Sequence, residues 1–190
     1  AGNRCKDECL PEETNRRIVD IISDVNLAYS EHARRYLADC GLPKERTYVT
    51  GSPMAEVLHE NLAEIEASDV HQRLGLEKGK YILLSAHREE NIDTEKNFTS
   101  LFTAINRMAE KYDMPILYSC HPRSRNRLAA SGFQLDPRVI QHEPLGFHDY
   151  NYLQMNAFAV VSDSGTLPEE SSFFTSVGHP FLSLIHISEP

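Results

Sequence analysis

The chain has 190 residues, of which 41% are hydrophobic and 25% charged, and its formal net charge is −9. This length and composition fit a globular chain of one ordinary domain or parts of two. The acidic balance excludes a general binder of nucleic acid or of anionic membranes, because both need a basic surface. A local group of basic residues is still compatible with an anionic small-molecule substrate.

The first part of the chain predicts helices and short strands in alternation. Pro11 suits the first turn of a helix, and the following Glu12 complements the positive end of the helix dipole. Ser30 is a typical helix cap, and Gly41 ends the helix that it starts. We predict, in order, a helix over 11–23, an extended piece over 24–29, a helix over 31–39 and a strand over 47–50.

The rest of the chain repeats this alternation with longer elements. The segment 98–111 has its apolar residues at helical spacing, and the apolar run 81–84 is typical of a buried strand. We predict helices over 54–67, 98–111 and 150–156, and strands over 81–84, 114–120, 139–140 and 157–162. Strands that alternate with helices indicate the α/β class, with a Rossmann-like, doubly wound parallel sheet.

Polar residues follow three of these strands. His87 and Arg88 come after the first, His121 after the second, and Ser162-Asp163-Ser164-Gly165 after the last. Ligands of doubly wound sheets bind beyond the carboxyl ends of the strands, so we expect these residues to converge on one site.

The run from Ser162 to Glu170 carries the most information. A strand that ends in Ser-Asp-Ser-Gly and leads into a helix presents unpaired N–H groups, which bind anions such as a diphosphate. Glu170 lies further into this helix, where its carboxylate can accept two hydrogen bonds from a sugar diol. This arrangement suggests a nucleotide-sugar site. An ordinary capped helix with acidic residues in its first turn explains the run equally well.

Other candidate residues also have a structural interpretation. His87 can transfer a proton or bind a pyrophosphate beside Arg88, or it can merely cap the end of a strand. His121, which precedes a proline, is as well suited to shaping a turn as to contacting a ligand. Glu12 and Arg16 are four residues apart, and taken alone they indicate a surface ion pair.

The chain contains no pattern typical of a metal site or of a disulfide framework. Its four cysteines do not form two close pairs, and its nine histidines include no His-x-x-x-His grouping. It also lacks the Gly-rich loops that bind dinucleotides or triphosphates. We find no apolar run long enough to span a bilayer and no leader. We therefore expect a cytoplasmic protein that has free thiols, needs no metal or cofactor, and has no nucleic-acid or membrane partner.

Five motifs together resemble those of the non-hydrolysing UDP-N-acetylglucosamine 2-epimerases. They occur in the family's order from Ala1 to about Phe181. Two segments, 86–91 and 146–151, are most similar to the branch that makes UDP-N-acetyl-L-fucosamine for capsules and O-antigens. The five motifs are Ala1-Gly2-Asn3-Arg4, Pro11-Glu12-Glu13-Thr14-Asn15-Arg16, Thr50-Gly51-Ser52-Pro53, Ser85-Ala86-His87-Arg88-Glu89-Glu90-Asn91, and Ser162-Asp163-Ser164-Gly165 through Glu169-Glu170.

The resemblance implies one half of a two-domain architecture like that of the nucleotide-sugar glycosyltransferases of the B fold. Residues 1–53 then correspond to the end of the first Rossmann-like domain and 54–181 to an incomplete second, UDP-binding domain. After Phe181 the family continues with a strand and a Thr/Ser-Glu-Arg-Pro-Glu segment, which residues 182–190 do not match, so we expect these residues to be artefactual. The family's catalytic aspartate and first basic loop would precede Ala1, so we expect this fragment to be inactive alone.

The resemblance also implies a reaction, which is epimerisation at C2 of a UDP-2-acetamido sugar by elimination and re-addition of UDP. The product would serve surface-polysaccharide synthesis, and the full-length protein would be a homodimer. A hydrolysing 2-epimerase and a UDP-sugar glycosyltransferase are the alternatives. The implied catalytic residues are Glu12, Arg16 and His87, and the implied UDP-binding residues are Arg88, His121, Tyr150 beside the uracil, Ser164 and Gly165 at the diphosphate, and Glu170 at the ribose.

Overall fold

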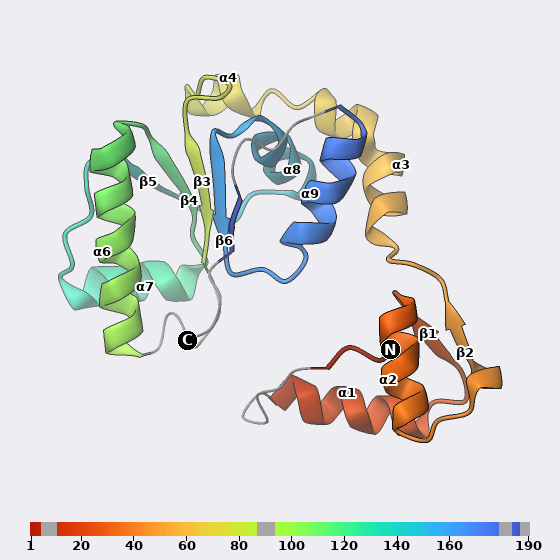
Figure 1. The fold of residues 1–190 in the computed structure, drawn as a ribbon. Helices are drawn as coiled ribbons and strands as arrows, with labels where there is room; N and C mark the ends of the chain where they lie inside the picture. The colour runs from red at the N-terminus through yellow and green to blue at the C-terminus, as the bar shows by residue number, and fades with distance from the viewer. Residues whose placement is uncertain (5–10, 87–93, 179–183, 187–190) are drawn as a thin grey trace. The chain divides into compact units, whose positions relative to one another are not determined.

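The computed structural model describes residues 1–4, 11–86, 94–178 and 184–186. The chain divides into two compact units, Ala1–Pro53 and Met54–Pro190, which are described separately (Figure 1).

The first unit pairs two short parallel strands with two helices. The predicted helices over 11–23 and 31–39 and both extended segments are confirmed to within two residues, and the Oγ of Ser30 caps the second helix by accepting from the Ala33 N–H at 3.2 Å. The elements are α1 (Pro11–Ile22), β1 (Asn26–Ala28), α2 (Glu31–Asp39), the 3-10 turn η1 (Lys44–Arg46) and β2 (Thr47–Val49).

Asp20 fixes the start of the chain to this unit. Its carboxylate is buried, accepts from the Gly2 N–H, and forms an ion pair with Arg4 at 2.6 Å. Gly2 has a positive φ of 74°, and a Cβ placed there would lie only 2.5 Å from the carbonyl oxygen of Ala33. Only glycine fits this close approach to α2, which gives the Ala-Gly-Asn-Arg motif a structural reason.

Apolar side chains lie exposed on both α1 and the strands of this unit. Ile21 and Ile22 of α1 are 68% and 74% exposed, and Leu27 and Tyr48 of the strands are also more than half exposed. A two-stranded sheet with so much exposed apolar surface is not typical of an independently stable domain.

The second unit is built on a five-stranded parallel sheet. Its strand order is β5-β4-β3-β6-β7, and every neighbouring pair is parallel, which confirms the predicted fold class. The strands are β3 (Ile82–Ser85), β4 (Ile116–Ser119), β5 (Val139–His142), β6 (Ala159–Ser162) and β7 (Leu184–His186).

Helices cover both faces of this sheet (Figure 1). Side chains of successive strand residues point to opposite faces, so Ile82 and Leu84 pack against α6 and α7, whereas Leu83 packs against α4, α8 and α9. The helices are α3 (Met54–Glu66), α4 (Val70–Leu74), α6 (Glu95–Tyr112), α7 (Pro122–Ser131), α8 (Phe147–Asn156) and α9 (Leu167–Ser176).

Helix α3 holds α8 and α9 together from outside. Leu58 and Ile65 of α3 form one buried cluster with Met155 of α8 and Phe174 of α9. This packing sets the position of α8 relative to α9, which matters for the site described below.

Helix α7 was not among the predicted elements. It is rich in polar residues and buries only Ser124 and Leu128, so it lacks the apolar period of a typical helix. Its start and end are nevertheless marked, because Pro122 is in its first turn and Gly132 ends it with a φ of 67°.

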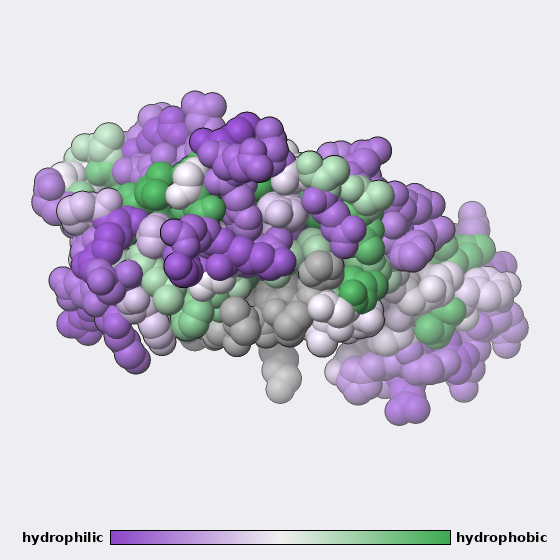
Figure 2. Space-filling view, turned by 90° about the horizontal axis from the view of Figure 1, so that it is seen from above, coloured by the Kyte–Doolittle hydropathy of each residue, from purple (hydrophilic) through white to green (hydrophobic). Residues whose placement is uncertain are grey.

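At the amino-terminal ends of the strands, the ring of Tyr81 contacts the ring of His71 in α4. The hydroxyl of buried Tyr81 donates to the Leu153 carbonyl at 2.6 Å and lies 3.0 Å from Nε2 of His71. Figure 2, which is seen from above, shows that the surface on this side of the molecule is mainly hydrophilic. Burial lowers the pKa of His71, and the positive charge of Lys78 lowers it further.

We expect the stability of the second unit to fall on acidification, partly through His71. Because its pKa is lower in the folded chain than in the unfolded chain, its stabilising contribution is complete above about pH 6.5 and is lost as the pH falls through the folded value. Urea unfolding at pH 7.5 and 5.0 measures this loss. His71→Gln should reduce the difference between the two pH values, whereas His59→Gln, at an exposed position of α3, should leave it unchanged.

Candidate functional site

The strand order reverses between β3 and β6. The chain leaves β3 toward β4 and β5 on one side, and returns to the other side of β3 through α8 and β6. Ser85 and Ser162 are paired at the carboxyl ends of these strands, and the Asp163 N–H donates to the Ser85 carbonyl at 3.2 Å. Open α/β sheets bind ligands at such a switch point, so this edge is the candidate site.

The turn after β6 is shaped by hydroxyl groups. Buried Ser162 accepts from the N–H of Ser164 at 3.0 Å, and the Oγ of Ser164 lies 2.9 Å from Oγ1 of Thr166. Gly165 is exposed and has no side chain to cover its N–H. Helix α9 then begins at Leu167, so the predicted order of strand, turn and helix start is confirmed.

Glu170 points its carboxylate back toward this turn. Its Oε1 accepts from the Thr166 hydroxyl at 2.8 Å, and its Oε2 accepts from Nε2 of Gln154 at 2.8 Å. A carboxylate has about four acceptor positions, so both oxygens can accept further hydrogen bonds. The group is therefore fixed in place and still able to bind a diol.

Tyr150 of α8 joins the two strand ends. Burial raises its pKa to about 12, the nearby carboxylates of Glu170 and Asp163 raise it too, and hydrogen bonds with Ser85 and Ser162 act in the opposite direction. The phenol is thus protonated at neutral pH and lies at the switch point. The structure brings four of the predicted site residues into this one cluster, namely Tyr150, Ser164, Gly165 and Glu170.

His121 lies at the carboxyl end of the next strand, β4. Its exposed ring caps α7, because Nδ1 accepts from the Arg123 N–H at 3.3 Å. This contact supports the turn-shaping interpretation, and the ligand contact stays a prediction. The adjacent Cys120 is a buried free thiol whose pKa is raised mainly by burial.

Four predicted site residues remain. His87 and Arg88 lie outside the described residues. Glu12 and Arg16 are exposed on α1, in the first unit. That helix does contain a pair four residues apart, but it joins buried Glu13 to Arg17 at 2.7 Å.

Three residues of the cluster were missed by the sequence prediction. Ser85 ends β3 and contacts Tyr150, while Thr166 and Gln154 hold Glu170. Helical spacing offered a signal for two of them, because Gln154 follows Tyr150 by four residues and Thr166 precedes Glu170 by four.

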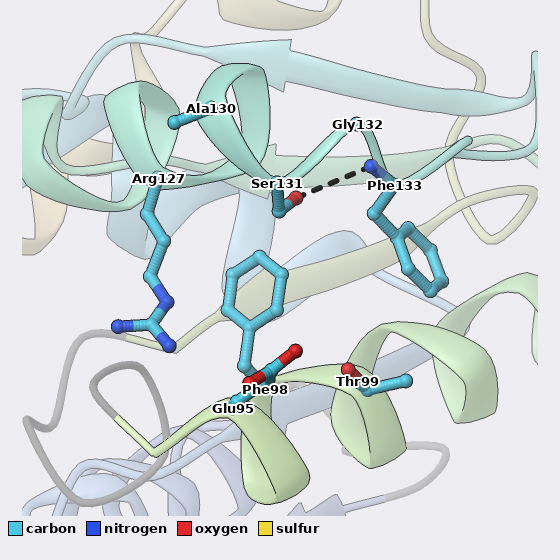
Figure 3. Close-up of a pocket in the computed structure, with 8 residues that line it drawn as sticks. All are labelled: Glu95, Phe98, Thr99, Arg127, Ala130, Ser131, Gly132 and Phe133. Atoms are coloured by element: carbon cyan, nitrogen blue, oxygen red, sulfur yellow. Dashed lines mark hydrogen bonds between the residues drawn. The ribbon is translucent and has the colours of Figure 1, made fainter.

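A separate hollow of about 380 Å³ lies between α6 and α7. Figure 3 shows Arg127 and Phe98 extending toward one another there, with the guanidinium 5.0 Å from the ring centre. No predicted site residue lines this hollow, whose walls are Glu95, Phe98, Thr99, Arg127, Ala130, Ser131, Gly132 and Phe133.

In the described part of the chain, no helix is both long and apolar enough to cross a bilayer. Among the same residues, no three histidine, cysteine, aspartate or glutamate side chains are grouped so that they could hold a metal ion.

Known proteins resemble this chain over nearly its whole length. The model of the family described as UDP-N-acetylglucosamine 2-epimerase matches residues 1–184. A UDP-N-acetylglucosamine 2-epimerase of Methanococcus maripaludis is 31% identical over 179 residues, which are 90% of this chain and 49% of that protein. The UDP-2,3-diacetamido-2,3-dideoxy-D-glucuronate 2-epimerase of Pseudomonas aeruginosa is 28% identical and is matched over 48% of its length. The chain thus spans about half the length of these relatives.

Solved structures confirm the fold. The UDP-N-acetylglucosamine 2-epimerase of Rickettsia bellii is 40% identical, with a TM-score of 0.86 over 100% of this chain and 48% of that one. The UDP-GlcNAc 2-epimerase of Methanocaldococcus jannaschii, solved in complex with UDP-GlcNAc and UDP, is 27% identical, with a TM-score of 0.83 over 98% of this chain and 57% of that one.

Proposed function

The chain belongs to the UDP-N-acetylglucosamine 2-epimerase family, and from this premise we propose that it supplies the nucleotide-binding half of an enzyme that inverts C2 of a UDP-2-acetamido sugar. The observation that carries the proposal is the cluster at the switch point, where the hydroxyl-rich turn after β6, the phenol of Tyr150 and the fixed carboxylate of Glu170 lie together. These are the groups that a diphosphate and a ribose need.

In this proposal UDP lies along the carboxyl edge of the sheet. The turn at Ser164 and Gly165 binds the diphosphate, because exposed N–H groups and hydroxyls before a helix stabilise an anion. Glu170 accepts hydrogen bonds from the ribose diol, and Tyr150 lies beside the uracil. His121 and Arg88 add contacts from the neighbouring strand ends.

The reaction needs groups on both faces of the sugar. A base removes the C2 proton while the C1–O bond breaks and its electron pair leaves with UDP, which gives a glycal. UDP oxygen then re-adds to C1 as a proton reaches C2 from the opposite face. We assign Glu12, Arg16 and His87 to this chemistry at C2. The turn at Ser164 and Gly165, which binds the diphosphate, stabilises the UDP leaving group.

We propose that residues 1–53 close a first Rossmann-like domain. The exposed apolar residues of α1, β1 and β2 support this, because they are suited to packing inside a larger sheet and helix layer. The chain alone then lacks half of its active site, and we expect it to be inactive.

On the motifs at 86–91 and 146–151, we assign the enzyme to the branch that makes UDP-N-acetyl-L-fucosamine for surface polysaccharides. One relative, from Pseudomonas aeruginosa, is named for a diacetamido sugar, which supports a substrate other than UDP-GlcNAc. We expect the full-length enzyme to be a cytoplasmic homodimer.

Calorimetry with UDP tests the binding half of the proposal on the 190-residue chain. We expect a dissociation constant in the micromolar range. Absence of binding at millimolar UDP would contradict a formed half-site.

Catalysis is tested by fusing the first half of the Rickettsia bellii relative to this chain. We expect NMR to show conversion of UDP-GlcNAc to UDP-ManNAc, or of the 6-deoxy-L-hexose equivalent, by the fusion and none by the chain alone. Release of free N-acetylmannosamine would instead favour the hydrolysing alternative. Transfer of the sugar to an acceptor would favour a glycosyltransferase.

A further inference from the structure

Two side chains hold the carboxylate of Glu170, and one of them comes from a different helix. Thr166 lies in the turn just before α9, whereas Gln154 lies in α8 and donates from Nε2 to Oε2 of Glu170 at 2.8 Å. We propose that Gln154 is a positioning residue, which orients the Glu170 carboxylate toward the ribose hydroxyls of UDP. This inference rests on the proposed function.

The burial of Gln154 argues against a role in packing alone. The residue is 1% exposed, and its Oε1 has no protein partner within the described residues. Burying an amide oxygen in this way costs about 1–3 kcal/mol, which a leucine or methionine of similar size would avoid. The donor end of the amide is therefore the part that the structure uses.

A comparison within α8 shows what is particular to Gln154. Asn151 and Asn156 are also buried amides, but their Nδ2 atoms donate to carbonyls of their own helix, those of Phe147 and Tyr152. Gln154 instead donates to a side chain of α9, and α3 packs against both of these helices. Because α8 is held against α9 by this packing, the amide of Gln154 holds the Glu170 carboxylate in one orientation.

An uncharged donor suits this task. A lysine or arginine at position 154 would neutralise the carboxylate and compete with the ribose hydroxyls for its lone pairs. The amide N–H uses one acceptor position of Oε2 and leaves the negative charge in place.

The test compares UDP with 2′,3′-dideoxyuridine diphosphate, which lacks the diol, by calorimetry on the full 190-residue chain. We expect the original chain to bind UDP at least tenfold more tightly than the dideoxy compound. Gln154→Met preserves the side-chain volume but removes the donor, and it should lower UDP affinity about tenfold while leaving the dideoxy compound unaffected. The second ligand thereby reports that the variant is folded.

Asn156→Leu is the matched control, because it removes a buried amide of α8 whose donor stays within the helix. We expect it to affect both ligands equally. A Gln154→Met variant that keeps the preference for UDP, or that loses both ligands to the same extent, overturns the positioning role and leaves the proposed function intact. An original chain with no preference for the diol refutes the ribose assignment of Glu170 and the inference with it.

Discussion

Replacing Glu170 by alanine should weaken UDP binding about a hundredfold, which is the largest effect that we expect from a single change in the site. The carboxylate is fixed by Thr166 and Gln154 and can offer two charge-assisted hydrogen bonds to a ribose diol. Each such bond contributes about 1.5 kcal/mol or more, and two of them account for the expected loss. Isothermal titration of the variant with UDP measures it.

Glu169→Ala is the control for this experiment. It removes a carboxylate of the same charge from the same first turn of α9, so it alters the helix dipole in a similar way. We expect its UDP affinity to stay within about twofold of the original, since a charge in the first turn of a helix contributes only some tenths of a kcal/mol through the dipole. Equal losses in both variants would mean that Glu170 acts through general electrostatics and not through contact with the ribose.

The second large effect concerns stability, and we expect Gly2→Ala to destabilise the first unit by about 3 kcal/mol or more. Two costs add, because a left-handed backbone costs a residue with a Cβ about 1–2 kcal/mol and overpacking typically costs about 1–3 kcal/mol. Here the new Cβ would lie 2.5 Å from the carbonyl oxygen of Ala33. Hydrogen exchange of the α2 and β1 amides measures the loss.

Gly41→Ala separates these two costs. Gly41 has a φ of 82°, similar to that of Gly2, but a Cβ there meets no atom within 4 Å. We expect this variant to lose only about 1–2 kcal/mol, the backbone part of the cost. If both variants lose the same amount, the close approach of the chain to α2 carries no energetic weight.

The sequence was a good guide where an element has a strong apolar period. The segment 98–111 was predicted as a helix and lies within α6, and the buried run 81–84 overlaps β3. Helix α7 was not predicted because it buries few residues and carries several arginines. The only sequence signals for it are its first-turn proline, its cap and the glycine that follows. Its surface position imposes almost no pattern on its residues.

The site was predictable only where its residues are close in sequence. Ser164, Gly165 and Glu170 belong to one strand-turn-helix segment, and their proximity follows from local geometry. Gln154 shares a helix face with Tyr150, but its contact with Glu170 depends on how α8 packs against α9, and the contacts of Tyr150 with Ser85 and Ser162 depend on how α8 packs against the sheet. The sequence also did not predict which strands flank β3, because an alternation of strands and helices does not determine the order of strands in the sheet.

The order of strands also constrains how the second unit folds. Ile82 of β3 pairs on one side with Ile116 and on the other with Ala159. The centre of the sheet therefore forms only after β6, which comes late in the chain, has been synthesised. While the polypeptide emerges from the ribosome, β3, β4 and β5 can associate first, and β3 then presents an open hydrogen-bonding edge to other nascent chains. The binding edge is therefore completed when β6 pairs with β3, whereas the open edge of β6 is covered only when β7 pairs with it.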